Sequence, residues 1–284
     1  MRTRLVGLPA VAALVLAGCS SGATPAPTAA PTSAPTAAPS APAGASAGAN
    51  SVTVYAAASL TAAFKDIAAA YQASHAGVTV TLSFDSSATL ETQIEQGAPA
   101  DVLASADTTN PKKLVDKGLA AGAPVNFAGN VLTIIVPVTG TQTVTTPMDL
   151  GKSGVKVVAA GDAVPITKYA NQLVANLAKL PGYPPDFVDA YTKNIASKED
   201  NVKGIVTKIE LGEGDGGVVY VTDAKASTKV KTVDVPAEAN VPATYAQVAV
   251  KASKNLAGAN DFMGFVISPA GQAILAKYGF LPPG

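Results

Sequence analysis

From residue 51 onward, short apolar runs alternate with segments in which apolar residues recur every three or four positions. A bounded apolar run is typical of a buried strand, whereas the three-to-four spacing indicates one face of a helix. We therefore expect strands at 52–57, 78–84, 102–106, 131–138, 155–160, 217–221, 230–235 and 245–250.

The helical spacing falls between these strands. Apolar residues share a face in four groups: Leu60, Phe64, Ile67 and Tyr71; Leu90 and Ile94; Tyr169, Leu173 and Leu177; Val202, Ile205, Val206 and Ile209. A last helix is expected over about 260–278. Strands that alternate with helices predict an α/β fold with mainly parallel sheets. The segment 51–284 is long enough for one large sheet or two smaller lobes, and the pattern leaves that choice open.

The first 18 residues have the pattern of a signal peptide. Arg2 and Arg4 precede an uncharged stretch, 5–18, that is shorter than the roughly 20 apolar residues of a membrane-spanning helix. The stretch ends in Leu16-Ala17-Gly18-Cys19, which resembles the lipobox of bacterial lipoproteins. That resemblance implies cleavage before Cys19 and a lipid on its sulfur. The alternative is an ordinary signal peptide with one small apolar cysteine.

Residues 19–50 form the next segment, and after Cys19 they are Ala, Ser, Thr, Pro and Gly, with a single Asn at the end. Such a composition buries too little apolar surface to offset the entropy of ordering the chain. We expect a tether that holds the following domain away from a membrane, so that the membrane is contacted through the lipid alone. A proline-rich partner motif is the alternative, although no charged flank supports it.

Composition excludes several classes of site. The 20 basic and 20 acidic groups balance, and removal of Arg2 and Arg4 with the signal leaves 18 against 20, a net charge of −2. A nucleic-acid-binding protein needs a basic face, so we expect no nucleic-acid partner. One cysteine and one histidine exclude multi-cysteine and multi-histidine metal centres, and no cofactor is expected.

Two expected strands run directly into hydroxyl residues that open a helix. Ser59 follows the first strand, and Ser86 and Ser87 follow the second. Helices also begin near Pro165 and near Asn201. The start of a helix offers free amide groups and the positive end of the helix dipole, so these turns suit an anion. The alternative for each serine is a plain helix cap.

Six segments carry a family resemblance. They are AAASL at 56–60, SFDSSATL at 83–90, GAPADVLASAD at 97–107, VPITKYA at 164–170, GVVYVTDA at 217–224 and YGF at 278–280. In this order they resemble the molybdate-binding proteins of ABC importers, and they cover essentially all of 51–284. The resemblance implies an α/β fold of the periplasmic-binding-protein type, in which two lobes, each a mainly parallel sheet flanked by helices, hold an oxyanion in the cleft between them.

The resemblance also implies the residues that bind molybdate. They are the hydroxyls of Ser59, Ser87 and Tyr220 and the backbone amides of Ile166 and Val202. Two positions depart from the family pattern. Ile166 and Thr167 stand where small residues are usual, which puts the shape of the cleft in doubt. One inserted residue, Asn201, makes the Val202 register uncertain, so Asn201 is the alternative contact.

By analogy, the first lobe takes 51–130 and 248–284 and the second takes 131–247, with hinges near Asn130 and Gln247. We expect a monomeric solute-binding lipoprotein on the outer face of the cytoplasmic membrane that captures molybdate, and tungstate as well, and delivers it to an ABC permease. No catalytic residue or metal ligand is expected, and Asp101 and Asp107 are interpreted as cap or loop residues rather than a catalytic pair. The alternatives are a receptor for another tetrahedral oxyanion such as sulfate, or a surface lipoprotein that binds a protein or glycan.

Overall fold

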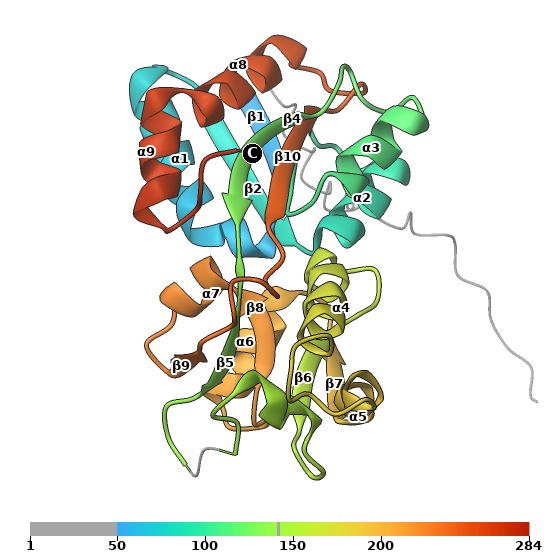
Figure 1. Cartoon of the computed structure of the whole chain (residues 1–284). Helices are drawn as coiled ribbons and strands as arrows, with labels where there is room; N and C mark the ends of the chain where they lie inside the picture. The colour runs from blue at the N-terminus through green and yellow to red at the C-terminus, as the bar shows by residue number, and fades with distance from the viewer. Residues whose placement is uncertain (1–49, 141–142, 284) are drawn as a thin grey trace, which may run out of the picture. The chain divides into compact units, whose positions relative to one another are not determined.

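Three β-sheets, of five, three and two strands, organise the part of the chain that the computed structural model describes, residues 50–140 and 143–283. The five-stranded sheet forms the centre of the first lobe and the other two sheets lie in the second, and Figure 1 shows the first lobe above the second. These residues belong to one compact unit, Ala45–Gly284. The expected signal peptide, the lipidated Cys19 and the tether lie outside the described residues, except for Asn50 at the end of the tether.

The first lobe contains a five-stranded sheet in the order β2-β1-β3-β10-β4. β1 (Ser51–Ala57) runs parallel to β2 (Thr79–Asp85) and β3 (Val102–Ser105), whereas β10 (Ala243–Ala249) is antiparallel to β3 and to β4 (Val125–Asn130). The covering helices are α1 (Thr61–Ser74), α2 (Ser87–Glu95), α3 (Thr109–Asp116), α8 (Leu256–Ile267) and α9 (Pro269–Lys277). In Figure 1, α1, α8 and α9 lie on one side of the sheet and α2 and α3 on the other.

The second lobe is built around β5 (Leu132–Pro137), which is antiparallel to β8 (Gly217–Tyr220) and β9 (Val230–Val233). A parallel pair, β6 (Val157–Ala160) and β7 (Ile195–Glu199), adjoins it through a bridge between Val157 and Gly216. The helical segments are η2 (Pro147–Gly151), α4 (Pro165–Leu177), α5 (Phe187–Lys193), α6 (Val202–Glu210) and α7 (Val221–Lys225). In each lobe one strand runs against the rest, β10 in the first and β5 in the second. The sheets are therefore mixed rather than mainly parallel, and both pairings of the three-stranded sheet are antiparallel.

The chain crosses between the lobes twice. The first crossing lies between β4, which ends at Asn130, and β5, which begins at Leu132. The return crossing lies before Ala243, because Ala243 already pairs with Asn130 of β4. The boundary expected at 247/248 is therefore wrong. Gln247 lies within β10, is fully buried and donates from Nε2 to Met263 O of α8 over 2.9 Å, so it anchors the strand in the first lobe.

Several elements differ from the expectation. β4 and β7 carry too few apolar residues to be recognised, and β7 alternates half-buried with exposed positions. The expected last helix is two helices, because Ser268 ends α8 and caps α9 by accepting from Gly271 N, with Pro269 as the first residue of α9. Within the described residues, no helix is long and apolar enough to cross a membrane.

A row of aromatic rings joins the cores of the two lobes. The Tyr245 ring of β10 lies 6.1 Å from Phe127 and 5.4 Å from Phe280 in the first lobe, and 5.6 Å from Tyr220 in the second. All four side chains are buried, and the apolar core is continuous through them. Such packing holds the ends of β8 and β10 together beside the point where the lobes meet.

Candidate functional site

A small cavity of about 10 Å³ lies where the two lobes meet. That volume is on the order of what a single water needs, so the walls are close together. It is lined by Ala57, Ala58, Ser59, Ser86, Ser87, Ala106, Val164, Pro165, Ile166, Asn201, Val202 and Tyr220. The structure thus brings together all five of the site residues expected from the sequence, three from the second lobe and two from the first.

Ser59 reaches the cavity from the 3₁₀ turn η1 (Ala58–Leu60) that joins β1 to α1. The side chain is not a helix cap, because neither η1 nor α1 has a side-chain cap bond at its N-terminus. Instead, Ser59 Oγ lies 3.0 Å from the hydroxyl of Tyr245. The interpretation of Ser59 as a plain cap is therefore wrong.

The two serines before α2 have separate roles. Ser86 is the helix cap, since its Oγ accepts from Thr89 N over 3.1 Å. Ser87 is the first helical residue, and its Oγ accepts from Ala106 N over 3.0 Å. A hydroxyl that accepts this bond keeps its own proton to donate, and Ser87 lines the cavity.

The start of α4 presents the Ile166 amide. Pro165 is the first residue of the helix, so Ile166 N–H lies in the first turn, where amides have no intrahelical acceptor. Thr167 Oγ1 lies 3.0 Å from Ala160 O and 2.9 Å from Gly161 O, which fixes the helix start against the end of β6. Thr167 therefore has a structural role that a glycine would not supply.

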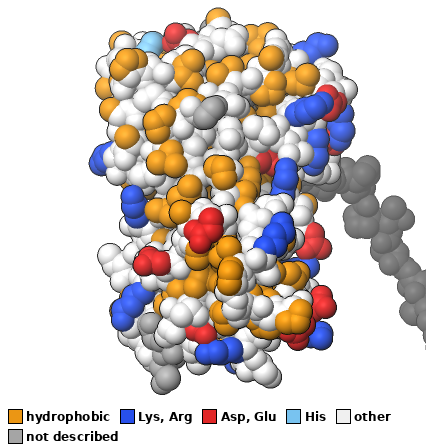
Figure 2. All heavy atoms as spheres, viewed as in Figure 1, with side chains coloured by type: hydrophobic (Ala, Val, Ile, Leu, Met, Phe, Trp, Pro, Cys, Tyr) orange, Lys and Arg blue, Asp and Glu red, His pale blue; other side chains and the backbone are white. Residues whose placement is uncertain are grey.

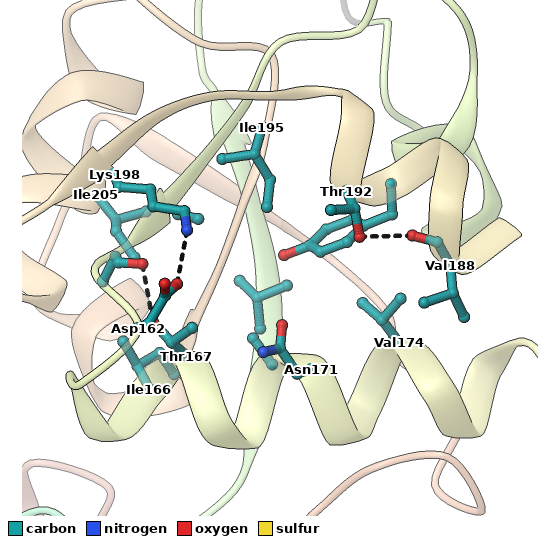
Figure 3. A pocket seen from close by; sticks show the side chains of 15 residues that line it. Asp162, Ile166, Thr167, Asn171, Val174, Val188, Thr192, Ile195, Lys198 and Ile205 are labelled. Carbon is teal, nitrogen blue, oxygen red and sulfur yellow. Dashed lines mark hydrogen bonds and ion pairs between the residues drawn. The ribbon is translucent and has the colours of Figure 1, made fainter.

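Ile166 also borders a second, larger cavity, of about 350 Å³, inside the second lobe between α4, α5, β6 and β7 (Figure 3). The lining is mostly apolar, and Lys198 and Asp162 form an ion pair at 2.6 Å on its edge. The isoleucine side chain thus has room within its own lobe. A side chain larger than the one usual in the family is accommodated by this second cavity.

The start of α6 presents the Val202 amide. Asn201 caps the helix, because its Oδ1 accepts from Lys203 N over 3.1 Å and from Gly204 N over 3.3 Å. Val202 is the first helical residue, and its own amide is not taken by the cap. The Asn201 Nδ2 donates to Asp85 Oδ1 in the first lobe over 3.0 Å. Both ends of the Asn201 side chain are thereby engaged, and within the described residues the Val202 N–H beside the cavity has no acceptor in its own helix.

Tyr220, the last residue of β8, supplies the third hydroxyl. Its ring is buried, and its Oη is buried without a hydrogen-bond partner within residues 50–140 and 143–283. Burial raises its pKa well above the usual value, and the neighbouring Tyr245 adds to the effect. The hydroxyl therefore keeps its proton, and an unpaired buried donor of this kind costs about 1–3 kcal/mol.

The electrostatics of the cavity come from dipoles rather than from full charges. α2, α4 and α6 begin at its wall, and their amides carry partial positive charge. Of the residues that line it, none is Lys, Arg, Asp or Glu. On the face shown in Figure 2, lysines and acidic side chains are interspersed over the outer surface. The lining is a set of uncharged donors; the carboxylates of Asp223 and Asp107 lie outside it, close enough to help raise the pKa of Tyr220.

The two carboxylates considered for catalysis are both engaged elsewhere. Asp107 Oδ1 accepts from Ser105 Oγ over 2.7 Å and from Asn110 N over 3.1 Å, next to α3. Asp101 Oδ2 accepts from Thr53 N over 2.7 Å, next to β1. Among the described residues, no group of three or more His, Cys, Asp or Glu is placed to hold a metal ion.

Tyr245 and Asn130 lie next to the site but were not connected with it from the sequence, which placed Asn130 only at a hinge. Tyr245 lies in the expected strand 245–250 and contacts Ser59, and Asn130 Nδ2 lies 3.4 Å from the Tyr245 hydroxyl. Both are buried. The sequence showed only that Tyr245 places a hydroxyl in an otherwise mostly apolar strand. It did not show which residue that hydroxyl contacts.

Comparison with known proteins agrees with this architecture. The family model for bacterial extracellular solute-binding proteins matches residues 52–281. The molybdate-binding protein ModA of Mycobacterium tuberculosis is 35% identical over 234 residues, which are 82% of this chain and 85% of that protein. A protein of Bacillus subtilis described as an ABC transporter substrate-binding lipoprotein is 32% identical over 81% of this chain and 86% of its own.

A solved structure shows the same fold. The periplasmic molybdate-binding protein of Azotobacter vinelandii superimposes with a TM-score of 0.70 and 23% sequence identity. The match covers 82% of this chain and 100% of that protein. The α/β architecture with two lobes, expected from the sequence, is thereby confirmed.

Proposed function

The chain belongs to the family of bacterial extracellular solute-binding proteins, and we propose that it captures molybdate between its lobes and delivers it to an ABC permease. Members of this family bind a solute and do not transform it, so the chain is not an enzyme and needs no cofactor. The choice of molybdate as the solute rests on the relatives, and the way in which it is bound is inferred from the residues that line the cavity between the lobes.

The observation that carries the proposal is the buried Tyr220 hydroxyl, which has no hydrogen-bond partner among the described residues and belongs to a residue that lines the same cavity as Ser59 and Ser87. A guest that accepts from it removes the cost of leaving it unpaired. With the Ile166 and Val202 amides, five donors surround the guest. Each bond to a charged acceptor contributes about 1.5–3 kcal/mol, so five contribute about 7.5–15 kcal/mol, and over most of that range they exceed the roughly 8 kcal/mol of a micromolar site. The excess offsets desolvation and the entropy of association.

A site made only of donors favours a fully deprotonated oxyanion. Molybdate and tungstate, both tetrahedral dianions at neutral pH, fit this requirement, and their similar size leads us to propose that both bind. Sulfate satisfies the donors too but is smaller, so it leaves longer and weaker bonds. A protonated oxyanion brings a hydroxyl that finds no acceptor in the cavity.

Capture requires the lobes to separate and close again. The narrow cavity and the Asn201–Asp85 bond are features of closely approached lobes. Two strand crossings, at Asn130–Leu132 and before Ala243, are the only covalent links between the lobes within the described residues. We place the hinge there, where a few backbone dihedrals can absorb the movement.

We also propose that the protein is a monomeric lipoprotein, anchored through Cys19 at the outer face of the cytoplasmic membrane. The lipobox-like LAGC sequence and the uncharged segment 20–50 support this, as does the lipoprotein relative in Bacillus subtilis. The segment gives the lobes reach from the membrane to the permease.

Thermal unfolding with a series of anions tests the proposal. At a hundredfold excess over its dissociation constant, a bound anion adds about 2.7 kcal/mol to the stability of the folded state. We expect molybdate and tungstate to raise the melting temperature at micromolar concentration, and sulfate and phosphate to do so only at much higher concentration. A response to sulfate alone would identify a sulfate receptor. No response to any oxyanion would point to a surface lipoprotein with a protein or glycan partner.

A further inference from the structure

The hydroxyl of Tyr245 lies between two polar groups, one on each side. Ser59 Oγ is 3.0 Å away, and Asn130 Nδ2 is 3.4 Å away. All three residues are buried, with exposed fractions of 0% for Tyr245, 1% for Asn130 and 7% for Ser59. Only Ser59 of the three lines the cavity between the lobes. The chain of contacts therefore runs from the first hinge crossing to the candidate anion site.

The orientation of the Asn130 amide follows from its neighbours. Its Oδ1 lies 3.0 Å from Val131 N, which is a donor, so this atom must be the oxygen. The amide nitrogen then lies 2.9 Å from Thr222 Oγ1 and 3.4 Å from Tyr245 Oη. A carboxamide nitrogen donates and does not accept, so the Tyr245 oxygen receives a proton from Asn130.

The direction of the next bond follows in turn. Because its oxygen accepts from Asn130, Tyr245 directs its own proton to the remaining neighbour, Ser59 Oγ. Burial raises the pKa of Tyr245 well above its usual value, so the phenol keeps that proton. Ser59 Oγ is then an acceptor toward Tyr245, and its own proton is left for the cavity.

We propose that Asn130 and Tyr245 are positioning residues that make Ser59 a donor toward the cavity and so exclude protonated oxyanions. The inference rests on the proposed function, since it concerns the selectivity of the same site. If a protonated oxyanion donated its proton to Ser59 Oγ, the Ser59 proton would have to point away from the anion. It cannot point toward Tyr245, because the Tyr245 proton already lies between the two hydroxyl oxygens. A fully deprotonated dianion meets no such conflict.

The test compares molybdate with phosphate, which carries one or two protons near pH 6.5. Calorimetric titration of the full chain gives the ratio of the phosphate to the molybdate dissociation constant. In Tyr245→Phe, Ser59 loses the proton that it received and is free to accept from a protonated guest. We expect molybdate binding to weaken about tenfold and the ratio to fall at least tenfold.

Two further variants keep the result interpretable. Asn130→Asp replaces the donor with an acceptor, so Tyr245 turns its proton to residue 130 and Ser59 again becomes free to accept; we expect the ratio to fall here too. Tyr71→Phe is the matched control, because Tyr71 is a buried tyrosine whose hydroxyl bonds Asp261 instead, and its ratio should equal that of the unmodified chain.

The outcomes separate the two proposals. An unmodified chain that does not bind molybdate defeats the proposed function. An unmodified chain that binds molybdate, with the ratio unchanged in both Tyr245→Phe and Asn130→Asp, overturns the positioning role alone. If both variants bind molybdate and phosphate more weakly by the same factor, the ratio is also unchanged. Tyr245 and Asn130 would then act only through packing.

Discussion

Asn201 Nδ2 donates a hydrogen bond to Asp85 Oδ1 over 3.0 Å, from the start of α6 in the second lobe to the end of β2 in the first. The same asparagine caps α6 through its Oδ1, and the same Asp85 oxygen accepts from Ser86 N over 2.7 Å. The bond thus ties together two of the segments that line the cavity. Asn201 was expected from the sequence only as the alternative to Val202 as an anion contact, and in the structure it is a helix cap and a link between the lobes.

Removal of this bond should speed the release of the anion. In Asp85→Ala the lobes lose one contact, partly open to solvent, and we expect the dissociation rate to rise about fivefold because such a bond contributes on the order of 1 kcal/mol. The association rate should change little, since the bond forms only after closure. Stopped-flow mixing of the protein with several molybdate concentrations gives the association rate, and displacement of bound molybdate gives the dissociation rate.

A charge exchange provides the control for the Asp85–Asn201 bond. Asn201→Asp alone keeps an acceptor to cap α6 but faces Asp85 with a like charge, so release should be faster than in Asp85→Ala. The double variant with Asp85→Asn and Asn201→Asp restores a donor and an acceptor in reverse order. Recovery of slow release is expected, and failure of the double variant to improve on Asn201→Asp would contradict the assignment.

Tyr220→Phe should separate binding from stability. The hydroxyl is buried and unpaired within the described residues, so its removal should leave the anion-free protein equally stable or more stable by about 1 kcal/mol. Affinity for molybdate should nevertheless fall about tenfold or more, because one donor to the anion is lost. Chemical denaturation and calorimetry measure the two effects, and a parallel loss of both would indicate a purely structural hydroxyl.

Features that depend on neighbouring residues could be predicted from the sequence, whereas features that depend on contacts between distant residues could not. Ser87, Ile166 and Val202 were proposed through the family resemblance, at turns where a local signal also predicted the start of a helix, and each lies in the first turn of its helix. Ser59 was also located, but its bond to Tyr245 spans 186 positions and leaves no trace in the sequence pattern.

The same reasoning explains the errors in the fold. The run that contains Tyr245 and Gln247 was correctly expected to be a strand, yet its periodicity does not say which sheet it joins, and so the return crossing was misplaced. The edge strand β7 was missed because Lys198 and Glu199 interrupt its apolar pattern. Pairing partners and edges depend on tertiary contacts, which a single sequence does not display.

Asp223 should make stability depend on pH. Its carboxyl is buried beyond Tyr220, with Lys203 Nζ 3.6 Å from Oδ1. Burial raises its pKa from 3.8 to about 6, against the opposing effect of Lys203. Between these values the folded state binds more protons than the unfolded state, so this group lowers stability as the pH rises from about 4 to about 6 and no further above that.

Asp223→Asn should therefore remove a loss of about 2–3 kcal/mol that the unmodified chain incurs over this interval. Urea denaturation without anion, at several pH values from 4 to 7.5, measures the difference. Asp162→Asn is the control, because that side chain is 83% exposed and should leave the pH profile unchanged. Identical profiles for Asp223→Asn and the unmodified chain would mean that Asp223 titrates normally.

Cys19→Ala should detach the protein from the membrane. It removes the sulfur that the proposed lipid anchor requires, so we expect the protein to leave the membrane fraction of cells that express it. The cavity lies in the unit Ala45–Gly284 and its anion affinity should be unaffected. Retention of the variant in the membrane fraction at the level of the unmodified chain would exclude lipid anchoring at Cys19.

The central claim is that uncharged donors alone surround the anion, and a crystal structure of the molybdate complex tests it most directly. We expect density for one tetrahedral anion between the lobes, with the hydroxyls of Ser59, Ser87 and Tyr220 and the amides of Ile166 and Val202 at about 2.7–3.2 Å from its oxygens. An anion held by lysine side chains, or bound outside this cavity, would contradict the claim.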